Sequence, residues 1–361
     1  MPITSRLSAA VKSLRRRKPP AAPPAPVLVA PPLIPAGLDA TAPRIIAVTT
    51  ERHRATFRAL AELLAEFGVR LERWGYPALF SAPSLPRAGY VLTDFDRLHP
   101  WQIELAGRLY RRLRGAGLAV LNDPCRFVPR VALLRRLQAA GINRFGVWLP
   151  AEGAMPDRFP VFLRTIHAHR GAESAIISDA EAAERALEKA LERGRVLSDL
   201  AFVEYAAEPE AGSGLFRKHA CYRVGDRLFR AATVTEADWV AKNGTVGAAS
   251  DAHYAADLAE QSDYPHAALM ARVFDLAGVQ YGRVDFGIVA GQPQIYEVNT
   301  NPDIRFSEDH PNADRRTVIT MIRAEMLEAL AALPPSGPGA PVPIDDLIRR
   351  EPPHPLAFGQ P

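Results

Sequence analysis

The sequence predicts an α/β protein that begins with a mainly parallel sheet. Short β-rich apolar runs alternate with segments whose apolar residues recur at helical spacing, starting from residues 44–49. This alternation is typical of βαβ units, in which a helix carries the chain back to start the next parallel strand. Apolar residues make up 48% of the 361 residues, enough to build a sizeable core.

Four strands and two helices are predicted between residues 44 and 123. The strands cover 44–49, 69–74, 88–93 and 118–121, and the helices cover 57–67 and 101–114. Ligands of parallel sheets bind beyond the carboxyl ends of the strands. We therefore expect Thr49, Asp94 and Asn122, at the ends of three of these strands, to lie at the mouth of a cleft.

The following part of the chain is expected to mix helices with further strands. Gly225 and Asp226 predict the turn of a hairpin, and Ser178 with Glu181 forms the pattern of a capping box at a helix start. The predicted strands cover 159–165, 201–205, 216–224, 227–235, 281–289 and 294–298, and the predicted helices cover 129–140, 179–193, 265–277 and 312–332.

The basic character of the chain comes from its first residues. The formal net charge is +4, yet residues 1–18 alone hold six basic residues and no acidic one. Ten of the 33 prolines precede residue 44 and nine follow residue 333. Segments so rich in Pro bury too little apolar surface to offset the loss of chain entropy on folding. We therefore expect residues 1–43 and 334–361 to be mostly disordered, and we expect no specific nucleic-acid partner.

Residues 1–18 have two interpretations. A short basic helix would make weak contact with an anionic surface, whereas a solubilising tail would make none. Two cysteines are too few for a disulfide-stapled secreted domain. No run of 18 apolar residues predicts a membrane span, and the basic cluster precedes no apolar segment typical of a signal peptide. These features predict a cytoplasmic protein.

Residues 282–302, GRVDFGIVAGQPQIYEVNTNP, carry the clearest chemical signal. Glu297 and Asn299 are two residues apart on one predicted strand, so they point to the same face, and a hairpin brings Asp285 alongside them. Two carboxylates and a carboxamide are hard oxygen ligands of the kind that Mg²⁺ prefers, with Mn²⁺ as an alternative. Arg283 shares the face of Asp285 and is a candidate for neutralising a phosphate or an oxyanion.

These residues resemble a known signature. R-x-D followed, after a short spacer, by E-x-N-T-x-P is similar to the metal-binding motif of the ATP-grasp family, in particular of D-alanine–D-alanine ligases. The resemblance covers residues 44–330 and implies an N-terminal parallel α/β domain followed by a two-subdomain ATP-grasp fold of the α+β type. It also implies an ATP- and Mg²⁺-dependent ligase that activates a small-molecule or peptide carboxylate as an acylphosphate and joins it to an amine.

The resemblance also implies a division of the chain into domains. The ATP-grasp part would consist of a lid subdomain with its linker and a metal- and phosphate-binding subdomain. The segments are a tail over 1–43, an N-terminal domain over 44–123, the lid subdomain and linker over 124–205, the metal and phosphate subdomain over 206–333, and a Pro-rich tail over 334–361.

Individual residues acquire expected roles from the same resemblance. The metal ligands would be Asp285, Glu297 and Asn299, and the groups that stabilise charge in the reaction would be Arg283 and Arg223. The nucleotide contacts would come from Arg130, Arg164 and Lys218 at the phosphates, Glu204 and Tyr205 at the adenine, Glu208 or Glu210 at the ribose, and Lys242 or Asn243 near the reacting groups.

Two departures from the family pattern keep other functions open. Arg164 stands where the family usually has Lys, and Arg presents a planar fork rather than a point charge. The loop over 167–173, which would cover the phosphates, contains a single Gly. The alternatives are an ATP-binding pseudoenzyme or regulatory nucleotide-binding module, and an ATP-grasp phosphotransferase. A dimer is a candidate assembly.

Overall fold

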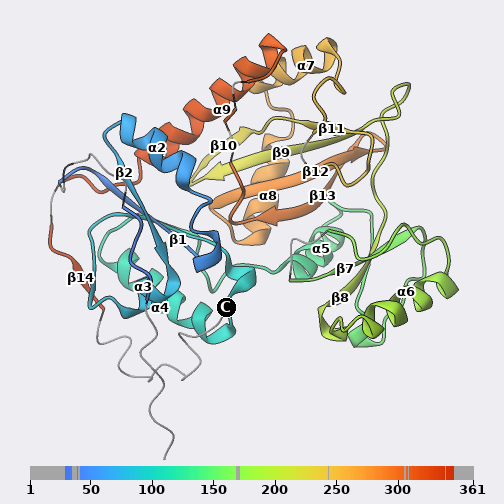
Figure 1. Ribbon diagram of the computed structural model, residues 1–361, viewed down its shortest axis with the longest axis horizontal. Helices are drawn as coiled ribbons and strands as arrows, with labels where there is room; N and C mark the ends of the chain where they lie inside the picture. Colours follow the sequence, from blue (N-terminus) through green and yellow to red (C-terminus); the bar gives the residue numbers. More distant parts are fainter. Residues whose placement is uncertain are drawn as a thin grey trace, which may run out of the picture.

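The computed structural model describes residues 29–34, 39, 41–167, 171–242, 244–304, 306–307, 309–337 and 339–344. These residues form a parallel sheet, two larger antiparallel sheets and one two-stranded ribbon, with helices packed against them (Figure 1). Short 3₁₀ turns cover Glu51–His53, Phe95–Arg97, Pro150–Glu152 and Leu197–Asp199. Within this described part of the chain, no helix is both long enough and apolar enough to cross a membrane.

The N-terminal sheet is parallel throughout, which confirms the predicted α/β domain. Its strands stand in the order β2-β1-β4-β5, and neighbouring strands run in the same direction. They are β1 (Arg44–Thr49), β2 (Arg70–Gly75), β4 (Gly89–Leu92) and β5 (Val120–Leu121).

Helices cover both faces of this sheet. Successive side chains of β1 point to opposite faces, so Ile45 packs in one core with α2 and α9, and Ile46 packs in another with α3 and α4. The helices are α2 (Arg58–Glu66), α3 (Tyr76–Ser81), α4 (Pro100–Gly115) and α9 (Ala313–Ala331). The N-terminal domain therefore shares a core with a helix from the far end of the chain (Figure 1).

Parts of both tails return to the N-terminal domain. Leu33 and Arg73 exchange two backbone hydrogen bonds of 3.0 Å at the outer edge of β2. Near the other end, β14 (Val342–Pro343) pairs with β3 (Ser84–Leu85), and Ile344 is fully buried. The expectation of disorder is wrong for these residues, because short apolar stretches among the prolines reach a sheet edge and a core. Residues 1–28 and 345–361 lie outside the described part.

A three-stranded antiparallel sheet follows, in the order β6-β8-β7. Its helix α6 begins one residue later than predicted, because the Asp179 side chain, rather than that of Ser178, accepts a hydrogen bond of 2.8 Å from Ala182 N. The Ser178 hydroxyl instead donates to Asp179. The elements here are α5 (Arg130–Ala139), β6 (Val147–Trp148), β7 (Val161–Thr165), α6 (Ala180–Glu192) and β8 (Leu200–Glu204).

The largest sheet is antiparallel, in the order β10-β9-β12-β13, with β11 paired to the free part of β9. Helix α8 packs on one face, and α7, which the sequence analysis missed, pairs with α9 (Figure 1). The elements are β9 (Phe216–Val224), β10 (Arg227–Arg230), β11 (Val234–Glu236), α7 (Asp251–Ser262), α8 (Ala267–Ala277), β12 (Tyr281–Val289) and β13 (Gln292–Asn299).

Two buried asparagine side chains attach the strands of the large sheet to other parts of the chain: Asn122 joins β12 to the parallel sheet, and Asn143 joins β13 to the segment between α5 and β6. The Asn122 carboxamide accepts from Tyr281 N at 2.8 Å and donates to Tyr281 O at 2.9 Å, and it also donates to Leu92 O of β4. Asn143 makes the same pair of bonds, at 2.8 and 2.9 Å, to Ile295 N and O. Each carboxamide thus replaces a strand partner, one for β12 and one for β13.

The three residues expected at a cleft mouth are instead buried. Thr49, Asp94 and Asn122 are exposed by 2% or less. They do lie at the carboxyl ends of parallel strands. However, β12 and the loop that follows β13 pack against that end of the sheet. The polar groups there are used to connect domains.

The Asn122→Ala variant should lose about 3 kcal/mol of unfolding free energy. The substitution leaves the backbone groups of Tyr281 and Leu92 buried without partners, and each unsatisfied group costs roughly 1–3 kcal/mol. Urea denaturation measures the loss. Gln292→Ala, which removes an exposed carboxamide from β13, is the matched control. Equal stability of the two variants would contradict the proposed clamp.

Candidate functional site

The motif residues lie together on one face of the β12–β13 hairpin. Asp285 is the register partner of Glu297, and Arg283 is the partner of Asn299, so all four side chains project to the same side. A bulge follows, because Phe286 pairs with Ile295 and leaves Tyr296 without a register partner. The hairpin and its shared face confirm the local geometry predicted from sequence.

Each carboxylate of the motif is paired with an arginine. Arg283 holds the 3%-exposed Asp285 with two bonds, Nε to Oδ1 at 2.6 Å and a terminal nitrogen to Oδ2 at 2.9 Å. Burial lowers the pKa of Arg283, but the Asp285 carboxylate more than offsets this and raises it above its ordinary value. Glu297 forms an ion pair with Arg130 at the start of α5. In this state Arg283 neutralises Asp285.

The donor set fits a magnesium ion held jointly with a phosphate-bearing ligand. Mg²⁺ is usually bound by one or two carboxylates, with water and substrate phosphates completing its shell. The described residues contain no group of three or more His, Cys, Asp and Glu side chains that could hold a metal by itself. Asp285, Glu297 and the oxygen of Asn299 therefore match a site that borrows ligands from a substrate.

A cleft opens beside these residues, between the three-stranded sheet and the large sheet. One end is aromatic, because the Trp239 ring lies 4.9 Å from the ring of Phe162 and 5.5 Å from that of Tyr205. The other end is charged and is lined by Arg164, Lys218, Lys242, Asp285 and Glu297. The lining of the cleft thus combines an aromatic cluster with three cations and two carboxylates.

Arg164 is a cation without a carboxylate partner among the described residues. Burial lowers the pKa of Arg164 to about 10, Arg130 acts in the same direction, and Glu297 opposes them. The side chain is therefore still protonated at neutral pH, and its Nε donates only a long bond of 3.4 Å to Thr165 O. A half-buried guanidinium of this kind favours an anionic ligand.

Lys218 reaches the same place from β9. Its Nζ lies 3.9 Å from Asp285 Oδ2, and it lines the cleft. The structure thus brings together six of the predicted residues, with Arg130 joining through Glu297: Arg130, Arg164, Lys218, Arg283, Asp285 and Glu297. Asn299 stands at the end of the same strand face.

The predicted hinge residues line the cleft, but their backbone N–H groups are in use. Glu204 N donates to Gly146 O at 3.0 Å, and Tyr205 N donates to Pro160 O at 2.8 Å. The Glu204 carboxylate accepts from Gly146 N and pairs with Arg158. The next two residues, Ala206 and Ala207, also line the cleft, so they are the better candidates for backbone contacts to a base.

Three expected site residues lie elsewhere. Side chains alternate along β9, and Arg223 is five positions from Lys218, so it points to the opposite face, where it binds Asp275 at 2.6 Å. Glu208 accepts from Ala290 N at 2.6 Å and, with Glu210, lines a separate hollow. The expectations for Arg223, Glu208 and Glu210 are therefore wrong in position.

Of the alternatives Lys242 and Asn243, only Lys242 belongs to the described residues. It lines the cleft near Gly171. Phe162 and Tyr296 are cleft residues that the sequence analysis missed. The bulge turns Tyr296 toward the cleft, where its hydroxyl donates to Ala206 O at 2.8 Å. A β-bulge cannot be recognised from the alternation of residues along a strand. Only the position of Tyr296 next to Glu297 could have indicated that it lines the cleft.

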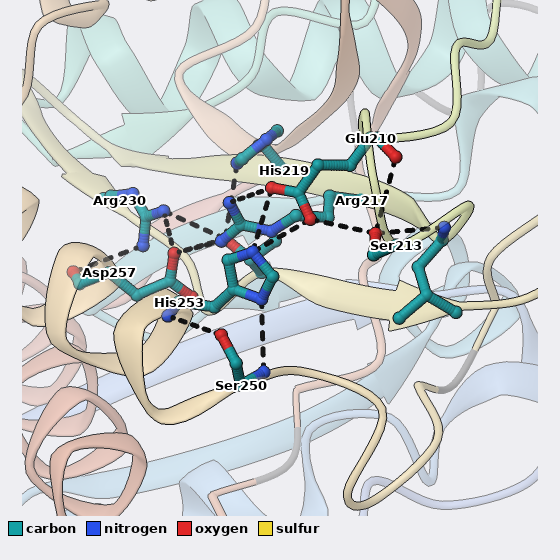
Figure 2. A network of polar contacts seen from close by, with 10 residues as sticks. Glu210, Ser213, Arg217, His219, Arg230, Ser250, His253 and Asp257 are labelled. Carbon is teal, nitrogen blue, oxygen red and sulfur yellow. Dashed lines mark hydrogen bonds and ion pairs between the residues drawn. The ribbon is translucent and has the colours of Figure 1, made fainter.

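The back of the large sheet carries a buried ionic network, shown in Figure 2. Arg217 and Arg230 both donate to Asp257, at 2.9 and 2.6 Å, and His253 pairs with Glu210. His219 belongs to the same face and stacks on Phe286 at 5.3 Å. Arg217 and His219 flank Lys218 along β9, and Phe286 follows Asp285 along β12, so this network lies on the face of the sheet opposite the motif carboxylates.

Comparisons with known proteins give only distant similarities, all of them to solved structures. Neither a scan of protein-family models nor a search of curated proteins finds a match. Among solved structures, D-alanine–D-alanine ligase from Bacillus anthracis complexed with ATP is 14% identical, with a TM-score of 0.47, over 81% of this chain and 97% of that chain. The RimK domain protein ATP-grasp from Sphaerobacter thermophilus is 18% identical, with a TM-score of 0.44, over 80% and 98%. D-alanine–D-alanine ligase from Coxiella burnetii is 11% identical, with a TM-score of 0.48, over 81% and 95%.

His219 should make the fold sensitive to mild acid. Burial lowers the pKa of His219 to about 3, and Arg217 and Arg230 add to the effect. In the unfolded chain its pKa is about 6.5. Below that pH the imidazole is protonated in the unfolded state but stays neutral in the folded state, which favours unfolding. Between pH 7 and 5 the unfolding free energy should therefore fall by about 2 kcal/mol more in the wild type than in His219→Phe.

Denaturant titrations at the two pH values measure this difference. His219→Gln is a second variant, in case the phenyl ring does not fit beside Phe286. If both variants lose stability with pH as steeply as the wild type, the imidazole is not held neutral in the fold.

Proposed function

We propose that this chain is an ATP-grasp enzyme that uses ATP and Mg²⁺ to join a carboxylate to an amine. The observation that carries the proposal is the cleft itself. Its lining combines the aromatic cluster around Trp239 with cations and with Asp285 and Glu297 on one hairpin. A flat base, a polyphosphate and a divalent cation have chemistry complementary to these three groups.

ATP would lie along the cleft with its base in the aromatic slot. The backbone of Ala206 and Ala207 would contact the base, next to Glu204 and Tyr205. Arg130, Arg164, Lys218 and Lys242 would hold the phosphates, since each is a cation at or beside the charged end. Asn243, the alternative to Lys242, keeps its proposed place near the reacting groups.

Asp285, Glu297 and Asn299 would hold Mg²⁺. The bound ion would neutralise negative charge on the phosphates. Metal binding would compete with the two ion pairs that now hold the carboxylates. Arg283 and Arg130 would then be released toward the anionic groups of the ligands, and long arginine side chains can make this change without movement of the strands.

The reaction has two balanced steps. An oxygen of the substrate carboxylate attacks the γ-phosphorus, a new O–P bond forms, and the bond from that phosphorus to the ADP oxygen breaks. The amine then attacks the acyl carbon, phosphate leaves with the C–O bond electrons, and the amine loses a proton. Arg283 and Lys218 would stabilise the negative charge that develops in both steps.

The same proposal assigns a role to each part of the chain. Residues 44–123 would select substrates, 124–205 would form the lid subdomain and linker, and 206–333 would hold metal and phosphate. A small-molecule or peptide carboxylate and an amine would be the substrates. We place the protein in the cytoplasm, where ATP is available.

One observation favours a second candidate, a nucleotide-binding module without turnover. Both motif carboxylates already have an arginine partner, and Arg283 holds Asp285 through two bonds. If these pairs persisted when ATP bound, the nucleotide would be held without a metal in place.

ADP release separates these candidates. The purified protein is incubated with ATP, Mg²⁺ and a panel of carboxylates, with and without a panel of amines. A ligase should release ADP only when a carboxylate is present, and Asp285→Asn should abolish the release. ATP binding without ADP release under any condition would favour the module, and a phosphorylated product formed with no amine requirement would favour a phosphotransferase.

Two cations on opposite faces of β9, Lys218 and Arg223, provide a matched pair of variants for testing nucleotide binding. Lys218→Gln should weaken ATP binding about tenfold, because a charge-assisted bond of roughly 1.5–3 kcal/mol is lost. Arg223→Gln should change it less than twofold, since Arg223 points away from the cleft. Calorimetric titration measures both affinities. Equal losses would contradict the assignment of the faces.

A further inference from the structure

Asp94 is a buried carboxylate in an unusual backbone conformation. It follows β4, is 2% exposed and has a φ of 63°. Among residues other than Gly, Asp is one of the few types that adopt this left-handed region with some frequency, because its short polar side chain bonds locally. The proposed mechanism makes no use of this residue.

On one side, Asp94 is held by the N-terminal domain itself. Its Oδ2 accepts from Thr50 N at 3.0 Å and from the Thr50 hydroxyl at 2.7 Å, and His53 Nδ1 lies 3.1 Å away. Arg97 Nε lies 3.4 Å from Oδ1. These contacts fix the carboxylate on the carboxyl end of the parallel sheet.

On the other side, Asp94 reaches the loop that follows β13. Its Oδ1 accepts from Asn301 Nδ2 at 3.1 Å, and its backbone N donates to the Thr300 hydroxyl at 3.2 Å. Asn301 N in turn donates to Asn299 Oδ1 at 2.8 Å. A continuous chain of hydrogen bonds therefore runs from the N-terminal domain to the carboxamide oxygen of the motif.

We propose that Asp94 is a positioning residue that fixes Asn299 for metal binding. Both oxygens of Asp94 are occupied by donors, so it acts on the site through the 299–301 loop and not as a ligand. This inference rests on the proposed function, since it takes Asn299 as a metal ligand. It makes the metal site a joint product of two domains.

The test uses Asp94→Asn in the full chain, with Asp123→Asn as the matched control. Asp123 follows the neighbouring strand β5 and bonds to Cys125 N and Arg126, with no link to the 299–301 loop. In Asp94→Asn, the affinity for Mg²⁺–ATP should fall about tenfold, as is typical when a residue that orients a metal ligand is changed. The affinity for ATP in EDTA should stay the same.

Calorimetry of both complexes distinguishes the outcomes. Unchanged Mg²⁺–ATP affinity in Asp94→Asn would overturn the inference, and so would an equal loss with and without metal. If the wild type binds ATP no better with Mg²⁺ than in EDTA, the proposed metal site itself is wrong.

Hydrogen exchange gives a readout that needs no nucleotide. The Asn301 amide, which Asn299 Oδ1 now protects, should exchange faster in Asp94→Asn and at the wild-type rate in Asp123→Asn. Combining Asp94→Asn with Asn301→Ala should cause little loss of Mg²⁺–ATP affinity beyond that of either change alone, because both break one chain of bonds. Unaltered exchange, or fully additive losses, would show that Asp94 does not act through Asn301.

Discussion

The candidate site depends on two buried carboxamides. The β12–β13 hairpin and Lys218 belong to the large sheet, whereas Arg164 comes from the three-stranded sheet and Arg130 from α5. Asn122 ties β12 to the parallel sheet and Asn143 ties β13 to the segment after α5. Each carboxamide satisfies both backbone polar groups of one strand residue, Tyr281 at the start of β12 and Ile295 on the outer edge of β13, so these buried groups are not left unpaired. These two attachments hold the hairpin that carries Asp285 and Glu297 against its neighbouring segments.

Charge balance is the second constraint on the site. Buried carboxylates are costly without a cation nearby, and Asp285 and Glu297 have arginine partners from different elements. Arg130 belongs to α5, so its pair with Glu297 also draws that helix toward β13. In the protein without ligands, these arginines balance the two carboxylates. If a divalent cation took over that role, the same arginines would be available to bind phosphates. Folding and ligand binding thus use one set of charges.

Features that depend on the alternation of side chains along a strand could be predicted from the sequence. Features that depend on packing between distant residues could not. The parallel domain, the hairpin and the shared face of Asp285, Glu297 and Asn299 follow from local patterns. Arg223 was assigned by resemblance, although its odd spacing from Lys218 already indicated the opposite face. The bulge at Tyr296 and the burial of Ile344 depend on contacts with distant residues, which no local pattern encodes.

The contact of Leu33 with the edge of β2 also bears on solubility. The rim of a sheet presents unpaired N–H and C=O groups, and these can recruit a strand from another molecule and start aggregation. Leu33 occupies that rim through two backbone bonds. Pro31 and Pro32 just before it have no N–H to offer, so the added segment is a poor template for a further strand. This short proline-rich stretch therefore blocks the addition of another strand at Arg73, on the β2 edge of the parallel sheet.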